Sequence, residues 1–286
     1  MSNQIYEHKA AAALETLGLN TAGEHLDQTA QQAAAGQWSY THFLGYLLDG
    51  ELEQRRRRSV EVSLKFARFP YQKRLADFDF AAQPSIDPRL IGELATGRFT
   101  SEGRNIVLLG PPGVGKTHLA IALGMSVAER GQRAYFTTAI DLARRLTKAT
   151  TENRLHRELK SLVQPSVLII DEVGYLTLDT TQASLVFQVI CQRYEKQQAI
   201  ILTSNKAFSE WAQVFAEDAV MASAALDRLL HRATVLNIRG ESYRLKERKK
   251  GDSREPIQSP GQPAQELTHR ANSKRAKENK GGACLI

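Results

Sequence analysis

Short apolar runs alternate with longer amphipathic stretches over most of the chain. Runs rich in β-branched and large apolar residues, bounded by turn residues, predict five strands, at residues 106–109, 133–138, 167–170, 199–203 and 234–240. The stretches between them have helical spacing. Strands that alternate with helices predict an α/β fold with a five-stranded parallel sheet and right-handed crossovers.

The N-terminal region has a different pattern, because it contains no strand-like run. Three helical stretches are expected, at about residues 11–20, 26–35 and 40–69. In the third stretch Phe43, Leu47 and Leu48 share one face. Pro70 ends the region. We therefore expect a small, all-helical N-terminal domain at residues 1–69.

A glycine loop joins the first predicted strand to a helix-forming stretch. Its residues are Gly110, Pro111, Pro112, Gly113, Val114, Gly115, Lys116, Thr117 and His118. Glycines let successive backbone N–H groups face a polyphosphate, and the helix that follows adds the positive end of its dipole. Lys116 can reach the β and γ phosphates, and the Thr117 hydroxyl is placed to ligate Mg²⁺. The loop predicts nucleotide binding, since a plain glycine turn rarely needs a Lys-Thr pair at this position.

Polar residues also follow the third and fourth strands, where parallel sheets bind ligands. We expect Asp171 to hold Mg²⁺ together with Thr117, through water, while Lys116 neutralises phosphate charge. Glu172 is the expected general base for the attacking water. Asn205 is expected to hydrogen-bond the γ phosphate or that water. The alternatives are a solvent-exposed acidic pair and an ordinary Ser-Asn turn.

Aromatic residues between the helical region and the loop have two interpretations. Phe69, Phe78 and Phe80 are most simply core residues, although one of the rings could border the adenine of a bound nucleotide. A single short helix is expected to follow, at residues 88–99. A single helical stretch is also expected at residues 208–233.

Positive charge is unevenly distributed along the chain. The net charge is +7, and the last 46 residues hold 11 Lys and Arg against 6 Asp and Glu. The polar tail at residues 251–286 is expected to be disordered, and its charge serves either nucleic-acid binding or solubility. Two further basic groups are candidate DNA contacts or solvated charged faces. They are the run Arg55, Arg56, Arg57 and Arg58, and the group Arg144, Arg145, Lys148, Arg154 and Lys160 between the second and third strands.

Several classes of protein are disfavoured by the sequence. No apolar run approaches the roughly 20 residues that span a bilayer, and the N-terminus lacks the layout of a signal peptide, so a cytoplasmic location is expected. Cys191 and Cys284 have neither metal-ligand spacing nor a disulfide framework. Both are expected to be free thiols.

The motifs GPPGVGKTHLA, VLIIDEVGYL, ILTSN with FSEW, and AALDRLLHRATVLNIRGESYR together resemble the IstB-like insertion-sequence ATP-binding proteins, AAA+ relatives of the helicase loader DnaC. The resemblance runs from about residue 10 to Lys250. It implies an AAA+ P-loop NTPase core at residues 70–250 without a C-terminal lid domain. It also implies a DNA-stimulated ATPase that uses ATP and Mg²⁺, assembles on duplex target DNA, and recruits or activates a cognate transposase.

The resemblance further implies roles for single residues. Lys116 and Thr117 match the first nucleotide motif, Asp171 and Glu172 the second, and Asn205 the sensor. Arg228 matches the arginine that such proteins insert into a neighbour's ATP site, which implies a homo-oligomer with ATP sites at subunit interfaces. Arg232, or a surface pair of Arg228 with Asp227, are alternatives. The alternative functions are a DnaC-type helicase loader acting on single-stranded DNA and a small-molecule phosphotransferase.

Overall fold

A five-stranded parallel sheet forms the centre of the structure, a computed structural model that describes residues 2–243. The strands are β1 Asn105–Leu109, β2 Ala134–Thr138, β3 Val167–Val173, β4 Ala199–Ser204 and β5 Ala233–Asn237. They lie in the order β2-β3-β4-β1-β5, and every pairing is parallel. The expected α/β fold and all five expected strands are confirmed, although β3 runs on to Val173 and β5 ends at Asn237.

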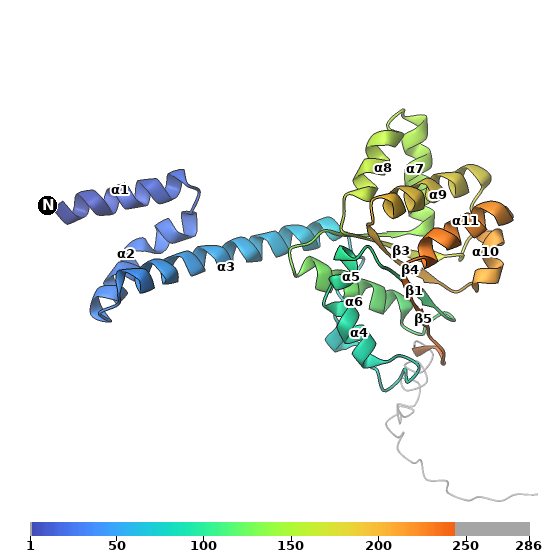
Figure 1. Cartoon of the computed structure of the whole chain (residues 1–286), viewed down its shortest axis with the longest axis horizontal. Coiled ribbons are helices and arrows are strands. Elements are labelled where there is room, and N and C mark those ends of the chain that lie inside the picture. The colour runs from blue at the N-terminus through green and yellow to red at the C-terminus, as the bar shows by residue number, and fades with distance from the viewer. Residues whose placement is uncertain (1, 244–286) are drawn as a thin grey trace, which may run out of the picture.

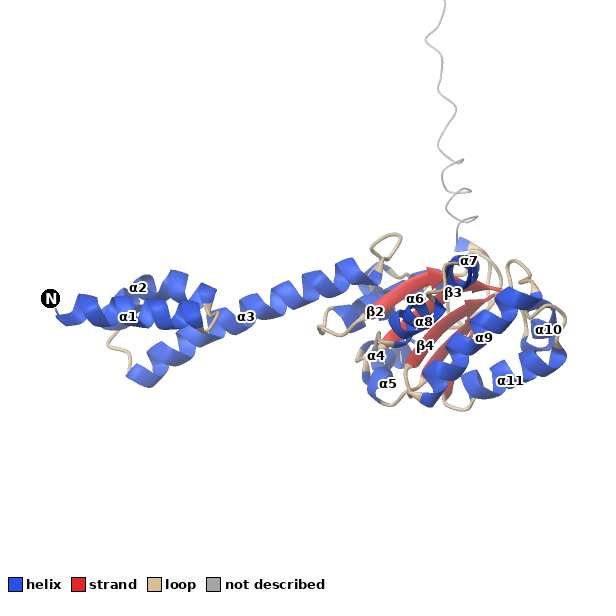
Figure 2. Ribbon diagram, turned by 90° about the horizontal axis from the view of Figure 1, so that it is seen from above, coloured by secondary structure: helices blue, strands red, loops and turns tan. Residues whose placement is uncertain are grey.

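Helices cover both faces of the sheet (Figures 1 and 2). They are α4 Pro88–Ala95, α5 Arg98–Ser101, α6 Lys116–Ala128, α7 Ala139–Thr151, α8 Leu155–Val163, α9 Thr180–Glu195, α10 Trp211–Val214 and α11 Ala219–Leu230, with 3-10 turns η1 Leu75–Asp77 and η2 Phe208–Glu210. One apolar cluster packs α7, α9 and α11 on one face, and a second packs α4 and α6 on the other. Because both faces are covered, most strand residues are apolar, which made the strands easy to predict.

Two expected helices are broken in the structure. The stretch at 88–99 divides into α4 and α5 at Gly97, whose φ is +76°. The stretch at 208–233 divides into η2, α10 and α11, with positive φ at Ala216 and Glu217. Trp211 and Phe215 are buried and stacked there, so the chain turns back over its own aromatic side chains before Asp218 caps α11. Tertiary packing overrides the helical pattern at this point.

Three helices make up the N-terminal region, as expected: α1 Ser2–Thr16, α2 Asn20–Ala35 and α3 Tyr40–Ala67. Ala22, Leu26 and Leu47 form their small core. The 28-residue α3 then extends to the sheet domain, so the α1–α2 hairpin stands away from it (Figure 1). Leu64 and Ala67 near the end of α3 pack into the cluster around α6. One continuous helix therefore links the N-terminal region to the domain that carries the glycine loop.

Several expectations concern residues beyond the described part of the chain. The tail at 251–286, Cys284 and the question of a lid after residue 243 all lie outside the described residues. Cys191 is a free, partly buried thiol, and burial raises its pKa. Among the described helices, none combines the length and the apolar character that crossing a membrane requires.

Candidate active site

The glycine loop turns the chain sharply between β1 and α6. Gly110, Gly113 and Gly115 all have positive φ, at +149°, +81° and +99°. A Cβ at Gly110 would collide with the carbonyl oxygen of Ile238, and one at Gly115 would lie 2.7 Å from the ring of Phe78. The glycines are therefore required by the chain's own packing around the loop, as well as by the approach of a phosphate.

The lysine of the loop curls over the turn. The Lys116 Nζ donates to the carbonyl oxygens of Gly110 at 2.7 Å and Pro111 at 2.8 Å. Helix α6 begins at Lys116, and no side chain of the described residues caps its N-terminus. The first N–H groups of the helix and the ammonium group thus lie together, in the arrangement that binds an anion.

Behind the loop, three oxygen-bearing side chains meet. The Thr117 hydroxyl donates to Asp171 Oδ1 at 3.0 Å, and the Thr203 hydroxyl donates to the same oxygen at 2.5 Å. Asp171 is 4% exposed. Hydroxyl and carboxylate oxygens suit Mg²⁺, which typically takes one or two protein ligands and completes its shell with water and phosphate. Thr117 and Asp171 therefore fit the expected metal ligands, and among the described residues no larger cluster of His, Cys, Asp or Glu offers another metal site.

Thr203 was not among the residues predicted from the sequence. Its Oγ also accepts from the backbone N–H of Glu172 at 3.0 Å, so one hydroxyl connects both acidic residues. A threonine directly after the apolar residues of β4 was the available signal, but its role becomes apparent only once β3 and β4 are known to be neighbours.

Glu172 is turned out of the sheet by an irregularity in β3. The pairing of β3 with β4 shifts between Ile170 and Val173, and Glu172 has φ +60°, a conformation that costs a non-glycine residue free energy. Its side chain is exposed, whereas those of Asp171 and Val173 are buried. The bulge thus separates the two acidic side chains, one held inside and one presented at the edge of the sheet.

Asn205 lies beside the loop, directly after β4. The N–H of Gly110 donates to the carbonyl oxygen of Ser204 at 3.2 Å, which brings the end of β4 next to the start of the loop. The Ser204 hydroxyl donates to the carbonyl oxygen of Val173 at 2.7 Å and so ties β4 to the end of β3. Asn205 itself is exposed at this edge. The loop, the acidic pair and Asn205 are thus brought to one edge of the sheet.

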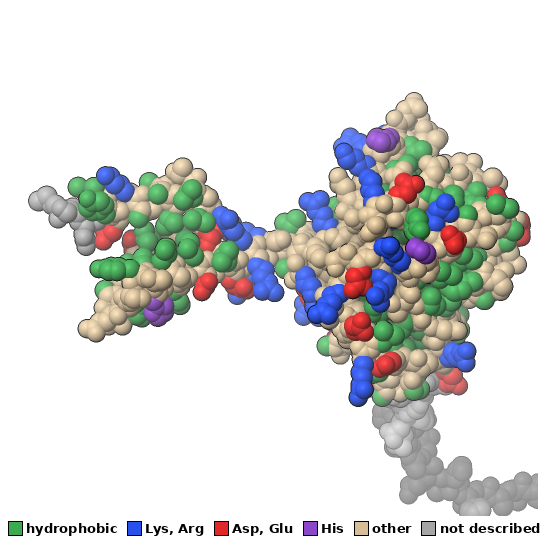
Figure 3. Space-filling view, viewed as in Figure 1, with side chains coloured by type: hydrophobic (Ala, Val, Ile, Leu, Met, Phe, Trp, Pro, Cys, Tyr) green, Lys and Arg blue, Asp and Glu red, His purple; other side chains and the backbone are tan. Residues whose placement is uncertain are grey.

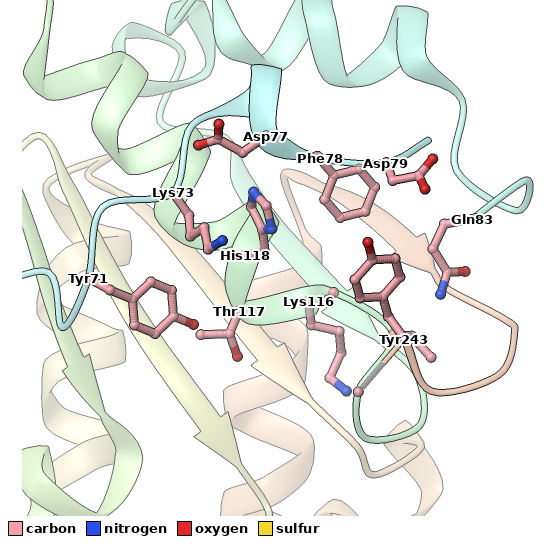
Figure 4. Close-up of a pocket in the computed structure, with 13 residues that line it drawn as sticks. Tyr71, Lys73, Asp77, Phe78, Asp79, Gln83, Lys116, Thr117, His118 and Tyr243 are labelled. Carbon is pink, nitrogen blue, oxygen red and sulfur yellow. The ribbon is translucent and has the colours of Figure 1, made fainter. Parts of the chain in front are cut away.

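A pocket of about 300 Å³ opens beside the loop (Figure 4). Its walls are the loop, the segment before α4 and the end of the described chain. The lining residues are Tyr71, Lys73, Asp77, Phe78, Asp79, Gln83, Gly113, Val114, Gly115, Lys116, Thr117, His118 and Tyr243. The N–H of Tyr243 donates to the carbonyl oxygen of Gly113 at 3.0 Å, so the chain after β5 rests on the loop. This volume is at the lower end of the range typical of small-molecule sites.

Of the three candidate phenylalanines, Phe78 lines this pocket. Its ring is edge-on to His118, with 5.1 Å between ring centroids. Phe69 packs against Phe136, and Phe80 against Phe78. The His118 Nε2 is 3.0 Å from the carbonyl oxygen of Arg74, which ties the start of α6 to the segment before α4.

Arg228 lies at the end of the sheet where the strands begin, opposite the end that carries the glycine loop. It lines a second pocket together with Asn105 and Gln198, which precede or begin strands, whereas the glycine loop follows a strand end. Its guanidinium group donates to the Ala224 carbonyl oxygen at 2.8 Å and lies over the Phe187 ring. None of the ion pairs in residues 2–243 joins Arg228 to Asp227. Arg228 therefore stands apart from the glycine loop of its own chain.

The two basic groups are only partly available to a ligand. Arg55 donates to Glu51 and, at 2.9 Å, to the Gly18 carbonyl oxygen, so it fastens α3 to the turn before α2. Arg57 pairs with Glu53. Arg56 and Arg58 are exposed and have no polar partner among the described residues. All four arginines are exposed, so the remaining question is which of them already have partners.

In the second group, Arg145 is bound within the chain. It pairs with Glu158 of α8 and also donates to Tyr135 and Ser161. Arg154 pairs with Glu152, and the Lys148 Nζ lies 3.9 Å from the same carboxylate. Arg144 and Lys160 remain exposed without such partners in the described chain. Figure 3 shows Lys and Arg side chains along α3 and near the tip of α7 and α8.

Replacing Thr203 with valine is expected to lower both stability and turnover. The change keeps the volume but leaves the Glu172 N–H without its partner and removes one donor from Asp171. Losing the partner of a buried polar group costs about 1–3 kcal/mol. Thermal unfolding and steady-state ATP turnover are the measurements. Thr137→Val, a matched change in β2 whose hydroxyl contacts only a neighbouring carbonyl, is the control; equal effects of the two changes would contradict the role of Thr203.

Comparison with known proteins places these features in context. A family model described as IstB-like ATP binding protein matches residues 12–251. The chain is 47% identical over 243 residues to a protein of insertion sequence IS21 from Pseudomonas aeruginosa that is named for ATP binding, covering 85% of this chain and 91% of that one. It is 45% identical over 249 residues to the corresponding IS5376 protein of Geobacillus stearothermophilus, covering 87% and 96%. Among solved structures, the DnaC helicase loader matches with a TM-score of 0.46 and 25% identity, covering 53% of this chain and 87% of that one.

Proposed function

The chain belongs to the family of IstB-like ATP-binding proteins, and from this premise we propose that it hydrolyses ATP while assembled on duplex DNA and thereby assists a transposase. The observation that carries the ATPase half is the cluster at one sheet edge: Thr117 and Thr203 both hold Asp171, and the bulge turns Glu172 outward beside them. A protein that only bound nucleotide would not need an exposed carboxylate held in a costly backbone conformation at this position.

In the proposed reaction, each side chain has one task. Lys116 exchanges the carbonyl oxygens of its own loop for the β and γ phosphates of ATP. Thr117 and Asp171 would hold Mg²⁺, which when bound offsets the charge of the phosphate oxygens. Glu172 accepts the proton of the water that attacks the γ phosphorus, the bond to the β-phosphate oxygen breaks, and ADP leaves. Asn205 orients that water by a hydrogen bond.

We further propose that Arg228 of a neighbouring copy adds a second positive group to the ATP site around Lys116. Arg228 stands at the opposite edge of the sheet from the loop, so a head-to-tail arrangement brings the two edges together. Such heterologous contacts build rings or open filaments. ATP turnover then depends on assembly.

Duplex DNA is the proposed surface for that assembly. Arg56, Arg58, Arg144 and Lys160 are exposed without ion-pair partners among the described residues, and their charges suit the phosphate backbone. Arg55 and Arg145 are left out of the proposed surface, since their guanidinium groups already pair with Glu51 and Glu158. Contact through exposed cations would give backbone readout with little sequence specificity. Transposase recruitment rests on the family alone.

The proposal is tested by ATP turnover measured without DNA, with duplex DNA and with single-stranded DNA. Turnover stimulated by duplex and reduced by salt supports it. Stimulation by single strands alone, in the presence of a ring helicase, would instead support a helicase loader. An ATP turnover rate that depends neither on DNA nor on assembly would favour a small-molecule phosphotransferase.

Lys116→Ala is expected to weaken ATP binding about 100-fold and to remove turnover. One charge-assisted hydrogen bond contributes about 1.5–3 kcal/mol, and about 2.7 kcal/mol corresponds to this factor. Binding is measured by calorimetry. Lys196→Ala is the control, because Lys196 is exposed at the end of α9, at the opposite edge of the sheet. An unchanged ATP affinity of the Lys116→Ala protein would contradict the assigned role of the loop.

A further inference from the structure

The pocket beside the glycine loop has a second end, formed by Phe78, Gln83 and Tyr243 (Figure 4). Phe78 and Tyr243 offer aromatic rings, and Gln83 offers a carboxamide. Lys116 and Thr117 line the same pocket and are the expected phosphate contacts. A nucleotide whose phosphates lie on the loop would therefore have its base within reach of aromatic faces and one amide.

Gln83 has an unusual environment for a glutamine. It is 3% exposed, and its Oε1 is buried without a hydrogen-bond donor among the described residues. A buried acceptor without a partner costs about 1–3 kcal/mol, so such a group calls for an explanation. The backbone of Gln83 is fixed on both sides, since its N–H donates to Phe80 and its carbonyl oxygen accepts from Ile86. The side chain is thus held at the pocket by a turn.

The segment after β5 also lies close to the Gln83 side chain. A Cβ at Gly240, whose φ is +148°, would lie 2.8 Å from the Gln83 Oε1. The glycine, whose φ disfavours other residues, leaves room there for the end of the Gln83 side chain. The final torsion of a glutamine side chain is broad, so the amide can turn its oxygen toward a ligand while its backbone stays fixed. The turn that contains Gln83 and the segment around Gly240 therefore both lie next to this carboxamide.

We propose that Gln83 recognises the base of the bound nucleotide, with its Oε1 accepting a hydrogen bond from the 6-amino group of adenine. The inference rests on the proposed ATP-binding function of the same pocket. The amino group supplies the donor that the buried oxygen lacks, and the amide nitrogen can donate to the adjacent ring nitrogen, as amide side chains do with adenine. Phe78 and Tyr243 provide surfaces against which the base packs. Gln83 is then a specificity-determining residue for the adenine nucleotide.

The test compares ATP with purine riboside triphosphate, which differs only by the absence of the 6-amino group. Affinities are measured by calorimetry on the full chain for the wild type, Gln83→Leu and Gln72→Leu. Gln72 is exposed on the same segment and does not line the pocket, so it is the matched control. The wild type and the control are expected to prefer ATP by about tenfold, the size of one hydrogen bond. The Gln83→Leu protein should bind both nucleotides within about twofold of each other.

Thermal unfolding of the nucleotide-free Gln83→Leu protein shows whether Gln83 serves base recognition or the stability of the fold. Leucine removes the buried acceptor, so the nucleotide-free Gln83→Leu protein should be as stable as the wild type or more stable. A wild type that binds both nucleotides equally overturns the proposal whether or not the variant folds. A Gln83→Leu protein that keeps the preference for ATP, or is less stable without nucleotide, overturns it as well. A wild type that binds neither nucleotide would contradict the proposed function itself.

Discussion

Replacing Arg228 with alanine is expected to lower DNA-stimulated ATP turnover by about 10³- to 10⁵-fold, the effect of an arginine supplied in trans to other NTPases. ATP affinity should change little, because Arg228 lies at the sheet edge opposite its own glycine loop. The fold should also survive. The guanidinium group is only partly buried and bonds one carbonyl oxygen, whereas Ala225 and Leu229 hold α11 in the core.

Turnover and ATP affinity of the Arg228→Ala protein are measured over a range of protein concentrations with duplex DNA. Arg232→Ala is the matched control, because Arg232 lines the same pocket and is the alternative candidate. Asp227→Ala tests the surface pair that the structure does not contain. An Arg228→Ala protein that hydrolyses ATP at the wild-type rate would exclude the role in trans, and a large loss in Arg232→Ala alone would move that role to Arg232.

Glu172→Gln is expected to bind ATP with unchanged affinity and to turn it over about 10²- to 10⁴-fold more slowly, the usual contribution of a general base. Glutamine has the same shape and keeps the backbone N–H that donates to Thr203, so the bulge in β3 should persist. Only the ability to accept a proton is lost. Because ATP then stays bound, assemblies on duplex DNA should last longer than those of the wild type.

Single-turnover hydrolysis and dissociation from duplex DNA measure these two effects. Glu93→Gln, an exposed change on α4, is the control. A Glu172→Gln protein that releases phosphate at the wild-type rate would show that another group activates the water. Weakened ATP binding with unchanged turnover would assign Glu172 a role in binding.

The α/β fold was predictable because both faces of the sheet are covered. Each strand is therefore a short, almost continuous apolar run, with turn residues at its ends. The resemblance to the IstB-like family, read from the motifs, is confirmed by the match over residues 12–251. The break between α10 and α11 was not predictable from helical spacing. It depends on the burial of Trp211 and Phe215, which local propensity does not contain.

The site residues also fall into those that the sequence predicted and those that it did not. Lys116 and Thr117 come shortly after the end of β1, and the acidic pair lies near the carboxyl end of β3, so their convergence followed from the topology. Thr203, Gln83 and Tyr243 acquire their roles from neighbours far away in the sequence, such as Asp171, Gly240 and Gly113. Single positions carry no signal for such contacts.

For the basic residues, too, the sequence did not reveal which side chains have partners within the chain. Arg145 looked available for DNA, but its partner Glu158 lies on the next helix, and whether a charged residue finds such a partner depends on helix packing. Arg55 is likewise held by Glu51 one turn away and by the Gly18 carbonyl oxygen. Charge runs in a sequence therefore overestimate the surface that is free to bind an anion.

An ATP site that Arg228 of a neighbouring copy completes on DNA can be tested by mixing two inactive proteins. Arg228→Ala keeps an intact loop and acidic pair but supplies no arginine, whereas Glu172→Gln supplies the arginine but cannot activate water. In an equal mixture on duplex DNA, about one quarter of the interfaces would pair an intact site with an intact arginine. Turnover is expected to return to about that fraction of the wild-type rate. A mixture no more active than its two components, at concentrations where both bind DNA, would exclude an arginine supplied by a neighbouring copy.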